Sequence, residues 1–243
     1  MKPIPFRSRV RAASTTLSLI LFPVFFYYLS PVIPLMGGSQ GIVTGSLIVF
    51  LVLFLSAAFL GRGFCSYLCP GGAIQDAACG AGSRLFNRSA RWIKWLVWGS
   101  WLIGLAFLFR RAGGVRGLRF AFGTQGGFSV SDVSSLIAYT MVALVFFLLP
   151  LLFGRRAACH TVCWMAPFLI LGRSAGRVLG LPSLRVRSDP ESCVSCGRCD
   201  AVCPMSLPVS RQLAAGQITS ADCILCGLCV DTCGRKTLKF SWR

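Results

Sequence analysis

Two runs of closely spaced cysteines near the end of the chain are the residues best suited to chemistry. They read CVSCGRCDAVCP, starting at Cys193, and CILCGLCVDTCG, starting at Cys223. Each run has the spacing Cys-x2-Cys-x2-Cys-x3-Cys, in which three thiolates hold one iron–sulfur cubane and the fourth reaches the neighbouring cluster. The spacing therefore predicts two [4Fe-4S] clusters and a role in one-electron transfer.

This crossed pattern assigns four cysteines to each cluster. The first cluster takes Cys193, Cys196, Cys199 and Cys233. The second takes Cys223, Cys226, Cys229 and Cys203. Gly197 and Gly227 lie inside the loops, where the backbone must bend sharply and its N–H groups can approach the cluster sulfurs. Zinc and disulfides are the alternatives, but zinc sites usually pair two Cys-x2-Cys units rather than two runs of four.

The rest of the chain must position these clusters, and its composition indicates a membrane. Of its 243 residues, 55% are hydrophobic and 13% are charged, whereas a soluble domain is about 25% charged. Four stretches are apolar on all sides and close to the roughly 17–25 residues that a spanning helix needs. They are residues 15–36, 42–60, 93–109 and 133–153. We predict four transmembrane helices, the first of them retained because it has no small-residue cleavage site.

The charge distribution predicts the topology. The formal net charge of +18 comes from 25 Lys and Arg against 7 Asp and Glu. Because the basic residues flank apolar stretches, contact with lipid headgroups explains them better than binding to nucleic acid does. We therefore expect no nucleic-acid partner. Most lie in the N-terminal arm, in the link between the second and third stretches, and after the fourth. The positive-inside rule then predicts a multi-pass protein of the bacterial inner membrane with both termini in the cytoplasm.

Four arginines are an exception, because they lie together in the one loop predicted on the outer side. They are Arg110, Arg111, Arg116 and Arg119. We favour their interpretation as interfacial anchors. The alternative is a docking site for an acidic outer partner or for a quinone headgroup.

The membrane half contains an internal repeat. RGFCSYLCPGGAIQD follows the second apolar stretch and RRAACHTVCWMAPFLIL follows the fourth, each with an arginine shortly before a Cys-x3-Cys pair. Both copies leave an apolar stretch on the same side, which predicts two parallel helical hairpins related by an axis along the membrane normal. One departure is that Cys163 is followed by Trp164, and the proline arrives only at Pro167, whereas Pro70 directly follows Cys69.

A Cys-x3-Cys pair places two thiols on one face of a helix. The repeat would bring together Cys65, Cys69, Cys159 and Cys163. These four could hold a third iron–sulfur cluster at the cytoplasmic membrane edge, act as two redox-active dithiols, or be buried thiols with no further role. Cys79 has no repeat partner and is interpreted as an ordinary small apolar residue.

Few other side chains in the membrane half can do chemistry. A single histidine, His160, excludes an intramembrane haem with two histidine ligands. It could tune a nearby cluster or relay a proton, although a lone histidine at a helix end is more commonly solvated or a cap. Asp76 and Asp132 could take protons from a quinol or cap helices, and Asp132 begins an SDVSS sequence typical of a cap.

These features predict two domains. Residues 1–182 would form an all-α four-helix transmembrane bundle of two parallel repeated hairpins, ending in an interfacial helix over 164–182. Residues 183–243 would form an α+β two-cluster ferredoxin-like domain in the cytoplasm, joined by a short linker that runs to Pro190.

The ordered set of motifs resembles the NapH-type membrane quinol dehydrogenase and polyferredoxin family, to which the larger NosR and CcoG types are related. The resemblance implies a membrane-anchored electron-transfer subunit that takes quinone or quinol as substrate. It would pass electrons between the quinone pool and a periplasmic reductase pathway, through an iron–sulfur or multihaem cytochrome subunit. The alternative is a cytoplasm-facing iron–sulfur reductase or assembly factor that serves the maturation of another redox complex. A redox sensor is a third hypothesis, but the sequence shows no output domain.

Overall fold

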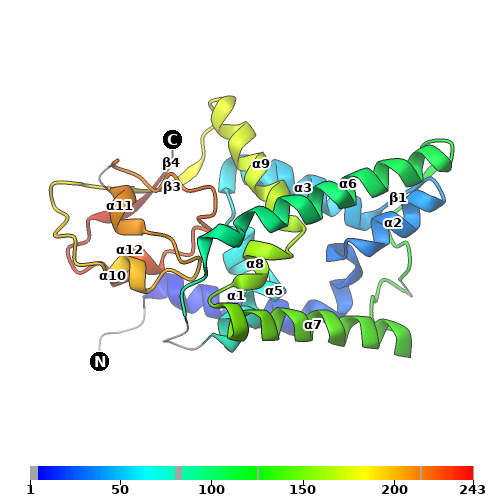
Figure 1. Cartoon of the computed structure of the whole chain (residues 1–243), viewed down its shortest axis with the longest axis horizontal. Coiled ribbons are helices and arrows are strands. Elements are labelled where there is room, and N and C mark those ends of the chain that lie inside the picture. Colours follow the sequence, from blue (N-terminus) through cyan, green and yellow to red (C-terminus); the bar gives the residue numbers. More distant parts are fainter. Residues whose placement is uncertain (1–4, 80–83, 125, 214, 243) are drawn as a thin grey trace.

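The computed structural model of the chain describes residues 5–79, 84–124, 126–213 and 215–242, apart from the side chain of Arg88. The molecule is elongated (Figure 1). Long helices occupy one end, and the cysteine-rich C-terminal segment occupies the other. The chain begins and ends at the cysteine-rich end, so both described termini lie on the same side of the long helices.

Two helices have the length and composition to cross a membrane. They are α6 (Ile93–Arg111), counted with the turn from Ser89, and α7 (Val133–Phe153). The helix α3 (Gly45–Leu60) is equally apolar but shorter. The predicted bundle of four spanning helices is therefore seen only in part among the described residues.

The first apolar stretch is not one helix, so the prediction of a continuous span over 15–36 is wrong. The helix α1 (Phe6–Phe25) starts earlier, and a short 3-10 turn, η1 (Tyr27–Leu29), and a second helix, α2 (Val32–Ser39), follow it. The break comes at Ser30, whose backbone is extended (φ −78°, ψ 137°). Pro31 follows it, and a proline disfavours helical geometry in the preceding residue.

The end opposite the cysteine-rich segment holds a small parallel sheet that the sequence did not predict. Strand β1 (Ile42–Thr44) pairs with β2 (Gly117–Arg119), with Ile42 opposite Gly117. The two strands come from the loops that precede α3 and follow α6. Strands of three residues are too short to give a recognisable alternation of apolar and polar side chains.

The sequence repeat corresponds to a structural repeat. In the first copy α3 ends at Gly61 (φ 55°) and is followed by the one-turn helix α4 (Phe64–Tyr67) and by α5 (Pro70–Ala78). In the second copy α7 ends at Gly154 (φ 100°), and α8 (Ala157–Thr161) and α9 (Met165–Val178) follow. The copies exchange partners, because α3 packs on α9 and α5 packs on α7. Each long helix is therefore held by the short helices of the other copy.

Helix α9 packs closely against α3. A Cβ added at Gly172 would lie 2.0 Å from the carbonyl oxygen of Phe54 on α3, and one at Gly176 would lie 2.5 Å from that of Ala58. Such a pair of small residues allows two helix backbones to approach. The helix expected over 164–182 runs from Met165 to Val178, and its Arg173 is buried.

In the C-terminal segment an antiparallel pair of strands, β3 (Leu184–Ser188) and β4 (Leu238–Trp242), encloses three short helices. These helices are α10 (Arg198–Ala201), α11 (Val209–Leu213) and α12 (Leu228–Thr232). The linker expected before Pro190 therefore contains a strand. Its alternation of leucine and valine with arginines is the pattern of a half-buried strand, so the sequence held the signal.

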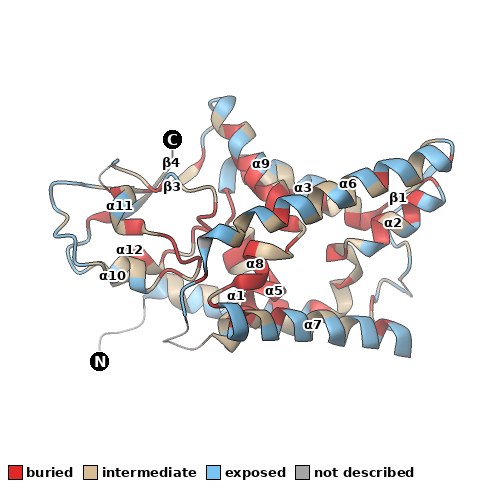
Figure 2. Ribbon diagram, viewed as in Figure 1, coloured by how far each residue is buried: buried red, intermediate tan, exposed pale blue. Residues whose placement is uncertain are grey.

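The buried residues do not stop at the boundary between the two parts. Ala57, Leu169 and Leu225 belong to one continuous hydrophobic cluster that also includes Cys65 and Cys223. Figure 2 shows buried residues running from the long helices into the loops of the cysteine-rich end. The membrane half and the C-terminal segment are thus packed together rather than tethered.

Candidate iron–sulfur centres

The two C-terminal cysteine runs fold into loops with the same backbone. In the first, Ser195 and Gly197 have φ angles of 50° and 71°, and in the second, Leu225 and Gly227 have φ angles of 55° and 79°. A side chain at positive φ costs roughly 1–2 kcal/mol. Its occurrence at the same place in both loops indicates that each loop is shaped to wrap a ligand. The glycines also cap the short helices α10 and α12.

The four cysteines predicted for the first cluster line one cavity. Its volume is about 290 Å³, and Cys193, Cys196, Cys199 and Cys233 all border it. Among the described residues, Arg198 and Arg235 are the charged side chains that line it. Four thiols and two cations around one hollow fit an anionic iron–sulfur cluster.

The cysteines predicted for the second cluster surround a smaller, more buried space. Cys203, Cys223, Cys226 and Cys229 line a cavity of about 20 Å³. Burial raises the pKa of the Cys203 thiol to about 12 and raises that of Cys229 as well. These thiols are therefore protonated when free, and iron binding would have to displace their protons.

The cysteine pairs of the repeat do not lie on one continuous helix, so that part of the prediction is wrong. Cys65 lies in α4, but this helix ends at Tyr67, and Cys69 follows in an extended conformation (φ −81°, ψ 115°). Pro70 accounts for the turn, because it disfavours a helical backbone at Cys69. Cys159 and Cys163 repeat the arrangement between α8 and α9, although no proline directly follows the second cysteine.

The four repeat cysteines nevertheless converge. All are between 3% and 5% exposed. Burial raises the pKa of Cys69, and the charges of the other three thiols would raise it further. Burial also raises the pKa of Cys163, to about 12, and that of Cys159. Thiols with a raised pKa need a metal or a nearby cation to become thiolates.

Each copy of the repeat carries a buried arginine three residues before its first cysteine. Arg62 Nη2 lies 4.0 Å from the sulfur of Cys65, and Arg62 Nη1 donates to Asp222 at 3.0 Å. Arg156 donates to both carboxylate oxygens of Asp76, at 2.7 Å and 2.6 Å, and to the carbonyl oxygen of Cys65 at 2.9 Å. The arginines were visible in the sequence, but their carboxylate partners were not.

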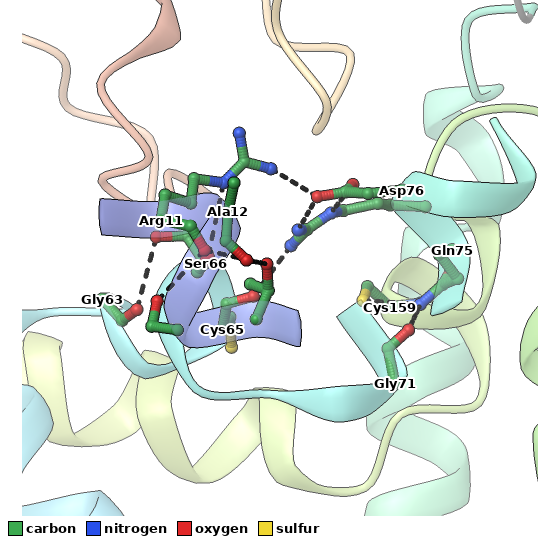
Figure 3. A network of polar contacts seen from close by, with 12 residues as sticks. Arg11, Ala12, Gly63, Cys65, Ser66, Gly71, Gln75, Asp76 and Cys159 are labelled. Carbon is green, nitrogen blue, oxygen red and sulfur yellow. Dashed lines mark hydrogen bonds and ion pairs between the residues drawn. The ribbon is translucent and has the colours of Figure 1, made fainter. Parts of the chain in front are cut away.

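Figure 3 shows this network around Cys65 and Cys159. Arg11 of α1 reaches both Asp76 and the carbonyl oxygen of Ser66. Gln75 Nε2 donates to the sulfur of Cys159 at 3.1 Å. The short helices that carry the four cysteines are thus held by charged and amide side chains from α1 and α5.

Positive charge exceeds negative charge at this centre. The carboxylate of Asp222 forms ion pairs with Arg62, with Lys94 Nζ at 2.6 Å and with Arg91 Nη1 at 3.4 Å. Burial opposes the ionisation of Asp222, but Arg62 and Lys94 outweigh it and lower the pKa to about 2. Five cations therefore face two carboxylates here, once Arg156, Arg11 and Asp76 are included. A cluster held by four thiolates carries net negative charge, so this surplus fits one.

His160 is neither solvated nor a cap, which corrects the more common interpretation of such a residue. It is fully buried and stacks on Phe86 with ring centroids 4.6 Å apart. Neither ring nitrogen has a hydrogen-bond partner among the described residues. Burial lowers the pKa of its imidazole to about 3, so the ring is neutral. An unpaired N–H beside Cys159 is the kind of donor that cluster sulfurs accept.

The two membrane-half carboxylates have different roles. Asp132 caps α7, because it accepts the backbone N–H of Ser135 at 3.2 Å, as its sequence indicated. Asp76 is not a cap. Burial opposes its ionisation, but Arg156 and Arg11 together lower its pKa. Asp76 is thus paired and ionised, which favours a role in stabilising the repeat over a role as proton acceptor.

The C-terminal segment contacts the membrane half through its second loop. Arg173 of α9 donates to the carbonyl oxygens of Ser220 and Cys223, at 2.9 Å and 3.2 Å. Arg7 of α1 pairs with Asp231 at 3.0 Å. The second cluster site is therefore next to the four-cysteine centre, whereas the first lies at the far tip of the molecule.

No group of three or more His, Cys, Asp or Glu among the described residues is close enough to hold a single metal ion. A cubane places its thiolates at the corners of a larger body than one ion. The described thiols are all free of disulfides, including the half-buried Cys79.

Comparison with known proteins agrees with these centres. Residues 42–89 match a 4Fe-4S binding domain family, and residues 185–234 match a 4Fe-4S dicluster domain family. The chain is 29% identical over 230 residues to a putative electron transport protein, YccM, of Escherichia coli, covering 87% of this chain and 62% of YccM. It is 28% identical to the ferredoxin-type protein NapH of Haemophilus influenzae, covering 82% of this chain and 69% of NapH. No solved structure matches the chain.

These matches and the paired cysteine loops define an iron–sulfur electron-transport protein. The chain is related to the ferredoxin-type NapH proteins of H. influenzae and E. coli, which align with 82% and 83% of it at 28% identity.

Proposed function

We propose that the chain is a membrane-anchored subunit that passes electrons between the quinone pool and a periplasmic reductase pathway. It would carry two [4Fe-4S] clusters in the C-terminal loops and a third on the four repeat cysteines. The observation that carries this proposal is the buried ion pair between Arg62 and Asp222. Arg62 lies three residues before Cys65 and Asp222 directly precedes Cys223, so the pair joins the membrane centre to the second cluster site.

An apolar groove beside the four-cysteine centre supports quinone as the substrate. It has a volume of about 420 Å³ and follows α1 from Ser14 to Phe25. Phe64 and Leu68, which flank Cys65 and Cys69 in the sequence, form part of its wall. A long apolar groove suits a polyprenyl quinone, whose electrons would have a short path to the buried thiols.

Iron content tests the third cluster. Wild-type protein should hold about twelve irons per chain, whereas clusters in the C-terminal loops alone would give about eight. Cys65→Ser should remove about four irons and leave the signals of the other clusters intact. Cys79→Ser is the matched control, because Cys79 lies outside every cavity that the cysteine sets line. About eight irons in both wild type and Cys65→Ser would contradict a third cluster.

Quinol oxidation tests the substrate. A quinol should reduce the clusters of the full-length protein in lipid nanodiscs, as followed by their visible absorbance. Leu21→Trp fills the groove and should raise the quinol KM several-fold without loss of iron. Leu152→Trp, on the exposed face of α7, is the control. If no quinol reduces iron-replete protein, the proposed function is wrong.

The outer end supports contact with a periplasmic iron–sulfur or cytochrome subunit. Arg111 stacks over the Phe107 ring at 5.8 Å, as an interfacial anchor would. Arg116 and Arg119 are exposed around β2, whose outer edge has no partner strand among the described residues. Co-purification of the chain with an outer subunit, and its loss in Arg116→Glu/Arg119→Glu, would test this contact.

A further inference from the structure

We propose that the tip of the C-terminal segment is a docking surface for an acidic, soluble one-electron carrier protein, which exchanges electrons with the first cluster. This inference goes beyond transfer between quinone and the periplasm, because it opens the same chain of centres to the cytoplasm. The docking surface consists of Val194, Cys196, Arg198, Arg235 and Lys236.

The two cluster loops differ in what covers them. A Cβ added at Gly227 in the second loop would lie 2.7 Å from Arg7 and 3.2 Å from Phe240. At the equivalent Gly197 of the first loop nothing lies within 4 Å. Since the two loops have the same backbone, this difference comes from their surroundings and not from their own folding.

The first loop is also the exposed one. Cys196 is exposed, and the apolar Val194 beside it is 58% exposed. Cys203, Cys223 and Cys229 of the second site are at most 9% exposed. A partner from solution can therefore approach the first site more closely than the second.

Position and charge identify the kind of partner. The loop between β3 and α10 lies at the end of the molecule farthest from β1 and α2 (Figure 1), away from the long apolar helices. Arg198 and Arg235 line the cavity of the first site, and no carboxylate does so among the described residues. Lys236 is exposed next to them. Asp200 does not line the cavity. Its Oδ1 accepts the backbone N–H of Ser210 at 2.7 Å and lies 3.8 Å from the sulfur of Cys199.

An exposed apolar residue in a loop that also carries cations is suited to an acidic partner, which positive charge steers to the redox centre. The reaction needs no proton and no bond change. The carrier loses one electron and the first cluster gains it, and the same contact serves the reverse direction.

The test uses the full-length, iron-replete protein in nanodiscs of neutral phosphatidylcholine. A plant-type [2Fe-2S] ferredoxin, which is acidic, serves as the electron donor, and stopped-flow absorbance gives the rate. We expect the rate to fall about tenfold between low and high salt. Arg198→Glu/Arg235→Glu should slow it about tenfold at low salt. Arg110→Glu reverses a charge at the exposed end of α6, far from this surface, and should have no effect.

Ferricytochrome c is a basic carrier that accepts electrons from the reduced protein, so charge reversal should change its rate in the opposite direction. Its rate should rise in Arg198→Glu/Arg235→Glu. If that double variant loses iron, Lys236→Glu serves as the test instead, because Lys236 does not line the cavity. This change should still slow electron transfer from ferredoxin about threefold. Rates that are independent of salt and equal in wild type and Lys236→Glu would overturn the proposal. Quinol reduction of the same samples is measured separately, so its failure would count against the proposed function and not against this surface.

Discussion

Arg62 and Asp222 form a buried ion pair, 3.0 Å long, across 160 residues of sequence. Arg62 stands beside a cysteine of the membrane half, and Asp222 stands beside a cysteine of the C-terminal segment. Lys94 of α6 binds the same carboxylate. One acidic side chain thus fixes the second cluster loop to two different parts of the membrane half.

Asp222→Asn should destabilise the protein strongly, because it leaves buried cations without their carboxylate. Removing one partner of a buried ion pair costs about 3–5 kcal/mol. The temperature at which the visible absorbance of the clusters disappears should fall by several degrees or more. Asp189→Asn is the control, since Asp189 is exposed. Equal temperatures for the two variants would contradict the importance of this pair.

The same carboxylate gives a pH dependence with a definite sign. The pKa of Asp222 in the folded protein is about 2, below the roughly 3.9 of an unfolded aspartate. Its stabilising contribution is therefore complete above about pH 4 and is lost as the pH falls towards 2. It amounts to about 2–3 kcal/mol. Urea unfolding of the iron-free chain, followed by tryptophan fluorescence at several pH values, should show a flatter dependence for Asp222→Asn.

The sequence indicates the cluster loops because their geometry is local. The spacing from Cys193 to Cys203 is set by how a short loop wraps a cluster, so the spacing alone indicates an iron–sulfur site. The pairing of Asp222 with Arg62 has no such local signal, because the fold alone brings the two side chains together. Ser30 shows a third case: Pro31 directly after it favours a break, but the apolar composition of residues 15–36 outweighed it in the prediction.

The two loop glycines should respond differently to alanine. Both have positive φ, so each change costs about 1–2 kcal/mol in backbone strain. Gly197→Ala should cost no more than that, because its Cβ meets nothing within 4 Å. Gly227→Ala should cost more, because its Cβ would displace Arg7 from Asp231. Thermal loss of cluster absorbance would measure both, and a larger effect at Gly197 would contradict the difference in packing around the two loops.

The crossing of α9 and α3 gives a prediction about the repeat itself. Gly172→Ala would place a Cβ 2.0 Å from the carbonyl oxygen of Phe54, so the helices must separate, and overpacking of this kind typically costs about 1–3 kcal/mol. Because α9 follows the second cysteine pair, separation should also displace Cys159 and Cys163 and reduce iron at the membrane centre before the C-terminal clusters are affected.

Gly104→Ala in α6 is the matched control for that variant. Nothing lies within 4 Å of its Cβ, and replacing glycine by alanine inside a helix favours the helix by about 1 kcal/mol. It should therefore melt at or above the wild-type temperature with full iron content. If Gly172→Ala kept its iron and melted like Gly104→Ala, the close approach of α9 to α3 could not be what holds the two copies of the repeat together.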